Sequence, residues 1–152
     1  MLSLDSLQTL PRELAWKEIN GLIRLRFPAI AHLTTQALAQ RLCQPNPPIL
    51  LDARTAEEFA VSHIPQARHI PDLPTVQAEL SRQDDLVVYC SVGYRSARLA
   101  NELQQAGFES VANLEGSIFQ WFNEGRLLVR AGQPTRDVHP YNALWGKLLK
   151  SP

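Results

Sequence analysis

The feature that most constrains the fold is a series of short apolar runs, each followed by a segment with helical spacing. The clearest runs are Ile49–Leu51, Leu86–Tyr89 and Val111–Leu114, and Ala67–Ile70 forms a weaker one. Short runs without polar alternation are typical of strands buried on both faces of a sheet. Because these strands alternate with short helices, we expect an α/β fold with a parallel sheet that helices cover on both sides.

The helices are predicted from their caps and spacing. Thr55 with Glu58, and Ser117 with Gln120, each match the capping-box pattern at a helix start. Gly107 is expected to end the helix that begins near Ser96, in a left-handed conformation. Further helices are expected at 10–26, from Thr34 or Thr35 to 42, at 76–81 as a single turn, and at 141–150.

Length and charge exclude several classes of protein. The chain has 152 residues, which fits one domain. It carries 15 Lys and Arg against 15 Asp and Glu, so the formal net charge is 15 − 15 = 0, and we expect no nucleic-acid partner. No apolar run approaches the ~18 residues of a membrane span, and the first residues lack the pattern of a secretory signal. We therefore expect a soluble cytoplasmic protein without a membrane partner.

Cysteine is the residue type with the clearest chemical context. The chain has two, Cys43 and Cys90, too few for a disulfide scaffold. Cys90 directly follows the strongest predicted strand, and in α/β sheets ligands bind at this end of the strands. A free cysteine is often only a small buried residue, but this position favours a reactive one. Cys43 lies on a predicted helix and is interpreted as a bystander, with a resolving thiol as the alternative.

The loop after Cys90 has features that stabilise a thiolate. It is short, contains Gly93 and leads into a helix, so its N–H groups and the positive end of the helix dipole can face the sulfur. Arg95 adds a cation that could attract an anionic substrate or pair with an acidic side chain. Cys90 is therefore the candidate nucleophile, and the loop is the candidate substrate site.

Four segments in order resemble the signatures of the rhodanese (sulfurtransferase) family. They are Leu51–Arg54 with Glu58-Phe59, His63–Ala67 with Gln66 where glycine is usual, Val88–Ala97 around Cys90, and Leu114–Ser117 with Trp121. The resemblance implies a central parallel sheet of five strands with helices on both faces. It also implies a helical extension at 1–31, a rhodanese-like domain at 32–130 and a C-terminal extension at 131–152 that packs on the domain.

The length of the Cys90 loop separates two kinds of chemistry on this fold. Related phosphatases and arsenate reductases place one more residue between the cysteine and the arginine, which enlarges the cradle for a tetrahedral anion. Here Ser91, Val92, Gly93 and Tyr94 alone separate Cys90 from Arg95. The smaller ring is expected to fit a single sulfur atom better, so phosphate or arsenate chemistry is the less favoured alternative.

The resemblance implies a sulfurtransferase that carries sulfur as a Cys90 persulfide. The donor is expected to be thiosulfate or a related sulfane compound, and the acceptor cyanide or a thiol. Ser91, Val92, Gly93, Tyr94, Arg95 and Ser96 are the predicted substrate-binding residues. A sulfur-carrier or regulatory module that acts with a protein partner is the alternative.

Several other polar residues have simpler interpretations. Asp52 and Arg54 are expected to hold the turn after the first strand of the domain, and the resemblance brings Glu58 toward the cleft. His63 and His69 match no strong zinc-ligand spacing. We therefore expect neither a metal nor a cofactor.

Overall fold

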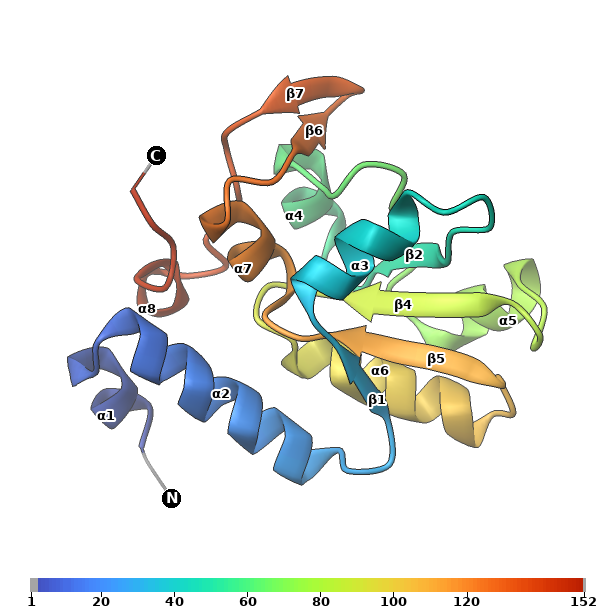
Figure 1. Ribbon diagram of the computed structural model, residues 1–152, viewed down its shortest axis with the longest axis horizontal. Coiled ribbons are helices and arrows are strands. Elements are labelled where there is room, and N and C mark those ends of the chain that lie inside the picture. The colour runs from blue at the N-terminus through green and yellow to red at the C-terminus, as the bar shows by residue number, and fades with distance from the viewer. Residues whose placement is uncertain (1–2, 152) are drawn as a thin grey trace.

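The computed structural model describes residues 3–151 and is built around one five-stranded sheet (Figure 1). All neighbouring strands are parallel, in the order β1-β5-β4-β2-β3. This arrangement confirms the predicted α/β class and the number of strands. The five strands are β1 (Ala31–Leu33), β2 (Ile49–Asp52), β3 (Arg68–His69), β4 (Asp85–Tyr89) and β5 (Ser110–Leu114).

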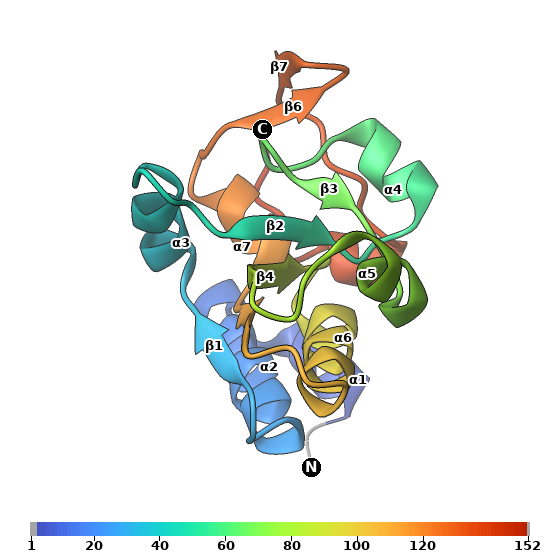
Figure 2. The same ribbon diagram turned by 90° about the vertical axis from the view of Figure 1, so that its right-hand side faces the viewer.

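Helices cover both faces of this sheet, with α3 and α7 on one side and α5 and α6 on the other (Figure 2). A separate hairpin of β6 (Leu128–Arg130) and β7 (Gln133–Thr135) follows α7. The helices are α1 (Leu4–Thr9), α2 (Arg12–Arg26), α3 (Thr35–Leu42), α4 (Ala56–Val61), α5 (Leu73–Glu79), α6 (Tyr94–Gln105), α7 (Ser117–Asn123) and α8 (Ala143–Gly146).

The central strand β4 explains the strongest apolar run of the sequence. Strands β2 and β5 flank it, and helices lie above and below, so Leu86, Val87, Val88 and Tyr89 are all fully buried. A strand in this position has no solvent-facing side, which is why its sequence shows no polar alternation.

Most predicted helix boundaries agree with the structure. Thr34 caps α3 through its side chain, Thr55 and Glu58 form the complete capping box of α4, and Gly107 is left-handed after α6. Helix α6 begins at Tyr94, two residues before the expected start, because left-handed Gly93 is its cap. Helix α5 begins three residues earlier than the expected turn and ends at Glu79.

Two predictions near the C-terminus were wrong. Ser117 does not cap α7, because Gly116 is the cap residue and makes no side-chain capping bond. The buried Ser117 hydroxyl instead donates to Leu114 O at 2.8 Å. Helix α8 is much shorter than the expected 141–150, since it starts only after Asn142 caps it. Strand β1 and the β6–β7 hairpin were not predicted.

The two ends of the chain pack together beside the sheet. Helix α2 buries Trp16, Ile19 and Ile23 in the same core that includes Leu148 of the C-terminal segment. Helix α8 lies next to α1 and the start of α2 (Figure 1), where Arg12 donates to Leu149 O at 3.3 Å. The segments before β1 and after β7 therefore contact each other and share the core of the domain.

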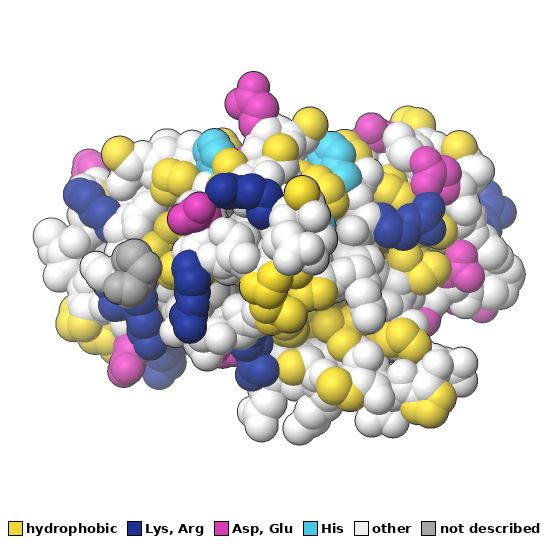
Figure 3. Space-filling view, turned by 90° about the horizontal axis from the view of Figure 1, so that it is seen from above, with side chains coloured by type: hydrophobic (Ala, Val, Ile, Leu, Met, Phe, Trp, Pro, Cys, Tyr) yellow, Lys and Arg dark blue, Asp and Glu magenta, His cyan; other side chains and the backbone are white. Residues whose placement is uncertain are grey.

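The surface and the helices add two observations. The face in Figure 3 carries both cationic and anionic side chains with apolar ones between them, as expected for zero net charge. No helix within residues 3–151 is both long enough and apolar enough to cross a membrane.

Candidate active site

Cys90 lies at the carboxyl end of β4, in the middle of the sheet. The chain leaves β2 toward β3 on one side and leaves β4 toward β5 on the other, so the loops after β2 and β4 diverge. A crevice at such a switch point is the usual ligand site of open α/β sheets. The loop after β2 leads to Glu58, and the loop after β4 carries Cys90, so the topology brings these two residues together.

The Cys90 loop takes its shape from one glycine and from α7. Gly93 has φ 114° and ψ −4°, a backbone conformation that side-chain-bearing residues rarely adopt. Cys90 O and Ser91 O accept hydrogen bonds from Ile118 N and Phe119 N, each at 3.1 Å. These bonds turn the first loop carbonyls toward the N-terminus of α7.

Two hydrogen-bond donors lie close to the Cys90 sulfur. Gly93 N donates to Sγ at 3.2 Å, and the Ser96 hydroxyl lies 3.3 Å from Sγ. The sulfur also lies at the N-terminus of the 12-residue helix α6, whose first N–H groups have no acceptor within the helix. This local field stabilises negative charge on sulfur in a site where Cys90 is only 1% exposed.

A polar chain on the far side of the sulfur holds Ser96. His32 Nε2 is 3.2 Å from Phe27 O, so this nitrogen carries the proton and Nδ1 accepts from Asn113 Nδ2 at 3.3 Å. That contact turns Asn113 Oδ1 toward Ser96 Oγ, which it meets at 2.6 Å. The single hydroxyl hydrogen of Ser96 is therefore shared between Asn113 and the sulfur, and Gly93 N is the undivided donor.

Arg95 is held by a buried carboxylate. Its two terminal nitrogens donate to Glu58 at 2.9 and 2.8 Å, and one also donates to Ser91 Oγ at 2.9 Å. The Ser91 hydroxyl in turn donates to Glu58 at 3.1 Å. The positive charge of Arg95 offsets the buried negative charge of Glu58, and the hydrogen bonds hold the guanidinium beside the loop.

The protonation state of this pair follows from its surroundings. Burial would raise the pKa of Glu58, but hydrogen bonds from Arg95 and Thr55 outweigh it and lower the pKa from 4.5 to about 2. Burial would also lower the pKa of Arg95, and its bonds to Glu58 reverse this and raise it above its ordinary value. Both groups are therefore charged near neutral pH.

Asp52 and Arg54 form a second ion pair, which is fully buried and holds two elements of the fold together. Arg54 donates to both oxygens of Asp52 and also to Ser62 O at 2.7 Å. Both side chains are 0% exposed. The pair ties the end of β2 to the end of α4, which confirms the expected role of these residues in holding this turn.

A cavity of about 470 Å³ opens over Cys90. Ser91, Val92, Tyr94 and Arg95 line it from the loop, and α1, α2 and the C-terminal segment line the other side. The Tyr141 ring lies under the Arg95 guanidinium at 4.7 Å and closes one wall. Cys90, the candidate nucleophile, thus lines this cavity together with most of the predicted substrate-binding residues.

The structure also bears on Cys43 and on the histidines, whose roles the sequence did not decide. Cys43 follows α3, whose Arg41 pairs with Asp85 at the start of β4, whereas Cys90 follows the opposite end of that strand. His63 stacks on Phe59 at 3.9 Å. No group of three or more His, Cys, Asp or Glu residues in the described part of the chain could hold a metal ion.

Two site residues were missed as such by sequence reasoning. Asn113 is fully buried and holds Ser96, while Ser117 Oγ accepts from Cys90 N at 3.2 Å. An available signal was the asparagine within the apolar run Val111–Leu114, since a buried amide must find hydrogen-bond partners. Its actual partners come from β1 and α6, which are distant in sequence.

Comparisons with known proteins agree with this geometry. Residues 34–124 match the family of the rhodanese-like domain. A "Sulfurtransferase" of Allochromatium vinosum is 33% identical over 102 residues, covering 66% of this chain and 95% of that protein. The "Putative sulfur carrier protein YrkF" of Bacillus subtilis is 28% identical over 95 residues, covering 61% of this chain and 51% of its own length.

A solved structure shows the same fold. The rhodanese-like domain protein of Staphylococcus aureus superposes with a TM-score of 0.59 at 30% identity, covering 66% of this chain and 98% of that one. The family match spans more than half of the chain and includes the whole Cys90 loop. The chain therefore belongs to the rhodanese-like domain family.

Proposed function

We propose that this protein is a sulfurtransferase that moves sulfane sulfur through a persulfide on Cys90. The Cys90 thiolate attacks the outer sulfur of thiosulfate, the donor's S–S bond breaks, and sulfite leaves with the bonding electron pair. A related sulfane donor releases the rest of its own molecule as an anion in the same way. The product is Cys90–S–S⁻. A thiolate or cyanide then attacks the outer sulfur and restores the Cys90 thiolate, so no redox partner is consumed.

One observation carries this proposal: Cys90 Sγ lies at the N-terminus of α6 and accepts a hydrogen bond from Gly93 N at 3.2 Å. A nucleophile stabilised as an anion needs no general base. The same donors can serve the terminal sulfur of the persulfide, which also carries negative charge. A reducing compartment such as the cytoplasm suits this chemistry, because both cysteines are free thiols.

The surrounding loop supports sulfur rather than oxyanion chemistry. Arg95 already gives its two terminal nitrogens to Glu58, so fewer donors remain for the oxygens of a bound phosphate. Ser91, Val92, Gly93, Tyr94, Arg95 and Ser96 remain the proposed substrate-binding residues. In this assignment Arg95 and the start of α6 attract the anionic donor, and the Gly93 amide holds the transferred sulfur.

Mass spectrometry of the protein, intact and after proteolysis, tests the proposal. After incubation with thiosulfate and removal of excess reagent, we expect a gain of one sulfur atom, about 32 Da, on a peptide that contains Cys90. Cys90→Ser should remain unmodified, while Cys43→Ser should gain sulfur like the natural chain. Sulfur bound to the Cys90→Ser variant, or thiocyanate formed from thiosulfate and cyanide by that variant, would refute the assignment.

A sulfur-carrier role is the second candidate, because the chain is similar to the putative sulfur carrier protein of Bacillus subtilis. A carrier would take up sulfur on Cys90 but turn over slowly with cyanide or small thiols, and a protein acceptor would accelerate release. Single-turnover loading compared with steady-state turnover separates the two roles. Equal rates for both steps would argue for a free-standing sulfurtransferase.

A further inference from the structure

The floor and the walls of the cavity over Cys90 differ in polarity and come from different parts of the chain. The loop supplies the floor with its sulfur and hydrogen-bond donors. The walls come from outside the family match, with Leu7, Ile19, Leu22 and Ile23 on α1 and α2, and Tyr141 and Trp145 on the C-terminal segment. These six side chains are apolar or aromatic, so the walls offer carbon surface and few hydrogen-bond donors.

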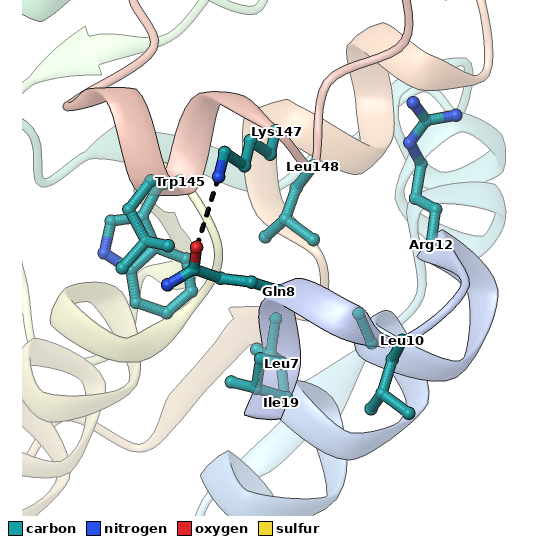
Figure 4. Close-up of a pocket in the computed structure, with 10 residues that line it drawn as sticks. Leu7, Gln8, Leu10, Arg12, Ile19, Trp145, Lys147 and Leu148 are labelled. Carbon is teal, nitrogen blue, oxygen red and sulfur yellow. Dashed lines mark hydrogen bonds between the residues drawn. The ribbon is translucent and has the colours of Figure 1, made fainter. Parts of the chain in front are cut away.

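The segments that form the walls are packed against each other and against the core. Leu7, Ile19 and Trp145 also line a second, smaller cavity of about 230 Å³, which lies between α1, α2 and α8 (Figure 4). There Lys147 Nζ donates to Gln8 Oε1 at 3.2 Å across the two ends of the chain. Ile19 and Ile23 belong to the buried core, which fixes α2 over the site.

The size of the cavity does not match an inorganic donor. Its volume of about 470 Å³ lies within the ~300–1,000 Å³ that is common for sites of organic ligands. Thiosulfate is only one SO₃ group with one added sulfur, and the six apolar and aromatic wall residues offer its oxygens few hydrogen-bond donors. Thiosulfate would therefore use the floor and leave most of the cavity unfilled.

The charges around the cavity select for an anion. The charged residues that line it are Arg26 and Arg95, both cations. Among the residues that the structure describes, Arg26 forms no ion pair, whereas Arg95 is paired with Glu58. An anionic reacting end and an apolar body would together satisfy the cavity.

From these observations we infer that the cavity is a subsite for the apolar body of an organic sulfane-sulfur anion. This inference rests on the proposed function and specifies the class of sulfur donor. The donor is R–X–S⁻, in which R is an aromatic or branched alkyl group and X is sulfur or a sulfonyl group. Cys90–S⁻ attacks the terminal sulfur, the X–S bond breaks, and R–X⁻ leaves with the electron pair as Cys90–S–S⁻ forms. The group R lies against the walls formed by α2 and the C-terminal segment.

Two thiosulfonates that differ only in R test the inference. Methanethiosulfonate and benzenethiosulfonate are compared as donors by kcat/KM, with cyanide as acceptor, and the ratio is corrected by their rates with a free small thiol. We expect the corrected ratio to favour the benzene compound by roughly tenfold to a hundredfold, the range for moving an aromatic ring from water to an apolar site.

Leu22→Ala and Leu14→Ala form a matched pair of variants on α2. Leu22 lines the cavity and is 36% exposed, whereas Leu14 is 50% exposed and lines neither this cavity nor the neighbouring one. Leu22→Ala should lower the preference for the benzene compound by roughly threefold or more, because apolar contact is lost. Leu14→Ala should leave the preference unchanged. Tyr141→Ala, on the opposite wall, should lower it independently.

The outcomes separate this inference from the proposed function. If no donor places sulfur on Cys90, the proposed function itself fails. If the natural chain uses both thiosulfonates with a corrected ratio near one, or if Leu22→Ala and Tyr141→Ala both keep its preference, sulfur transfer stands and the apolar subsite is wrong.

Discussion

The pair of Glu58 and Arg95 gives the sharpest physical prediction, through the substitution Glu58→Gln. Glu58 is 2% exposed and accepts from Arg95, from the Ser91 hydroxyl and from the backbone of Thr55. Glutamine keeps the shape of the side chain but removes its charge, as protonation of the carboxylate would. The variant therefore isolates how much the ionised form of Glu58 stabilises the fold.

The lowered pKa sets the size and the pH dependence of the effect. Each pKa unit corresponds to about 1.4 kcal/mol, so a shift from 4.5 to about 2 is worth ~3 kcal/mol. Between these values the unfolded chain binds the proton and the folded chain does not, so stability rises with pH. The contribution is complete above about pH 4.5, falls to about 2 kcal/mol at pH 3.5, and is lost near pH 2.

Urea unfolding at several pH values measures this contribution. We expect Glu58→Gln to lower the free energy of unfolding by ~3 kcal/mol at pH 7, and the difference from the natural chain should shrink as the pH falls through the window. Exposed Glu57, in the same first turn of α4, supplies the control Glu57→Gln, with an effect below about 0.5 kcal/mol. A difference that does not depend on pH, or one below ~1 kcal/mol at pH 7, would refute the reasoning.

Two further substitutions test the loop. Ser96→Ala removes a donor shared between Cys90 and Asn113, so sulfur uptake should slow by roughly tenfold or less, and the unpartnered Asn113 should cost ~1–3 kcal/mol in urea unfolding; an unchanged stability would contradict the assigned hydrogen bond. Gly93→Ala forces a side chain into φ 114°, so we expect a cost of ~1–3 kcal/mol and at least about tenfold slower sulfur uptake. Gly125→Ala, at φ 71° with open space around it, should destabilise less and leave uptake unchanged; equal loss of uptake in both variants would show that loop geometry is not the cause.

Local patterns predicted the parts of the fold whose cause is local. The unbroken apolar run of β4 is a direct consequence of burial on both faces, and the Thr55–Glu58 capping box joins residues only three positions apart. Gly107 likewise has a local reason, since the chain turns there in a left-handed conformation. In each case the residues that carry the pattern also make the contacts.

Elements whose contacts are distant in sequence were missed or misjudged. Strand β1 has three residues and pairs only with β5, about eighty residues later, so no local pattern marks it. Ser117 has the sequence of a capping residue, but its hydroxyl faces Leu114 O and Cys90 N once α7 packs under the loop. One of these two partners, Cys90, comes from the loop after β4 and is 27 residues away in sequence.

The same division applies to the site as a whole. The sequence by itself determined the family, the alternating strands and helices, and the loop from Cys90 to Ser96, because these depend on burial and on residues close together along the chain. Only the tertiary structure decided that Glu58 pairs with Arg95, that Asn113 accepts a hydrogen bond from Ser96, and that α2 and the C-terminal segment line the cavity over Cys90. These contacts join different elements of the fold, and a sequence pattern records which side chains are buried but not which distant side chains they meet.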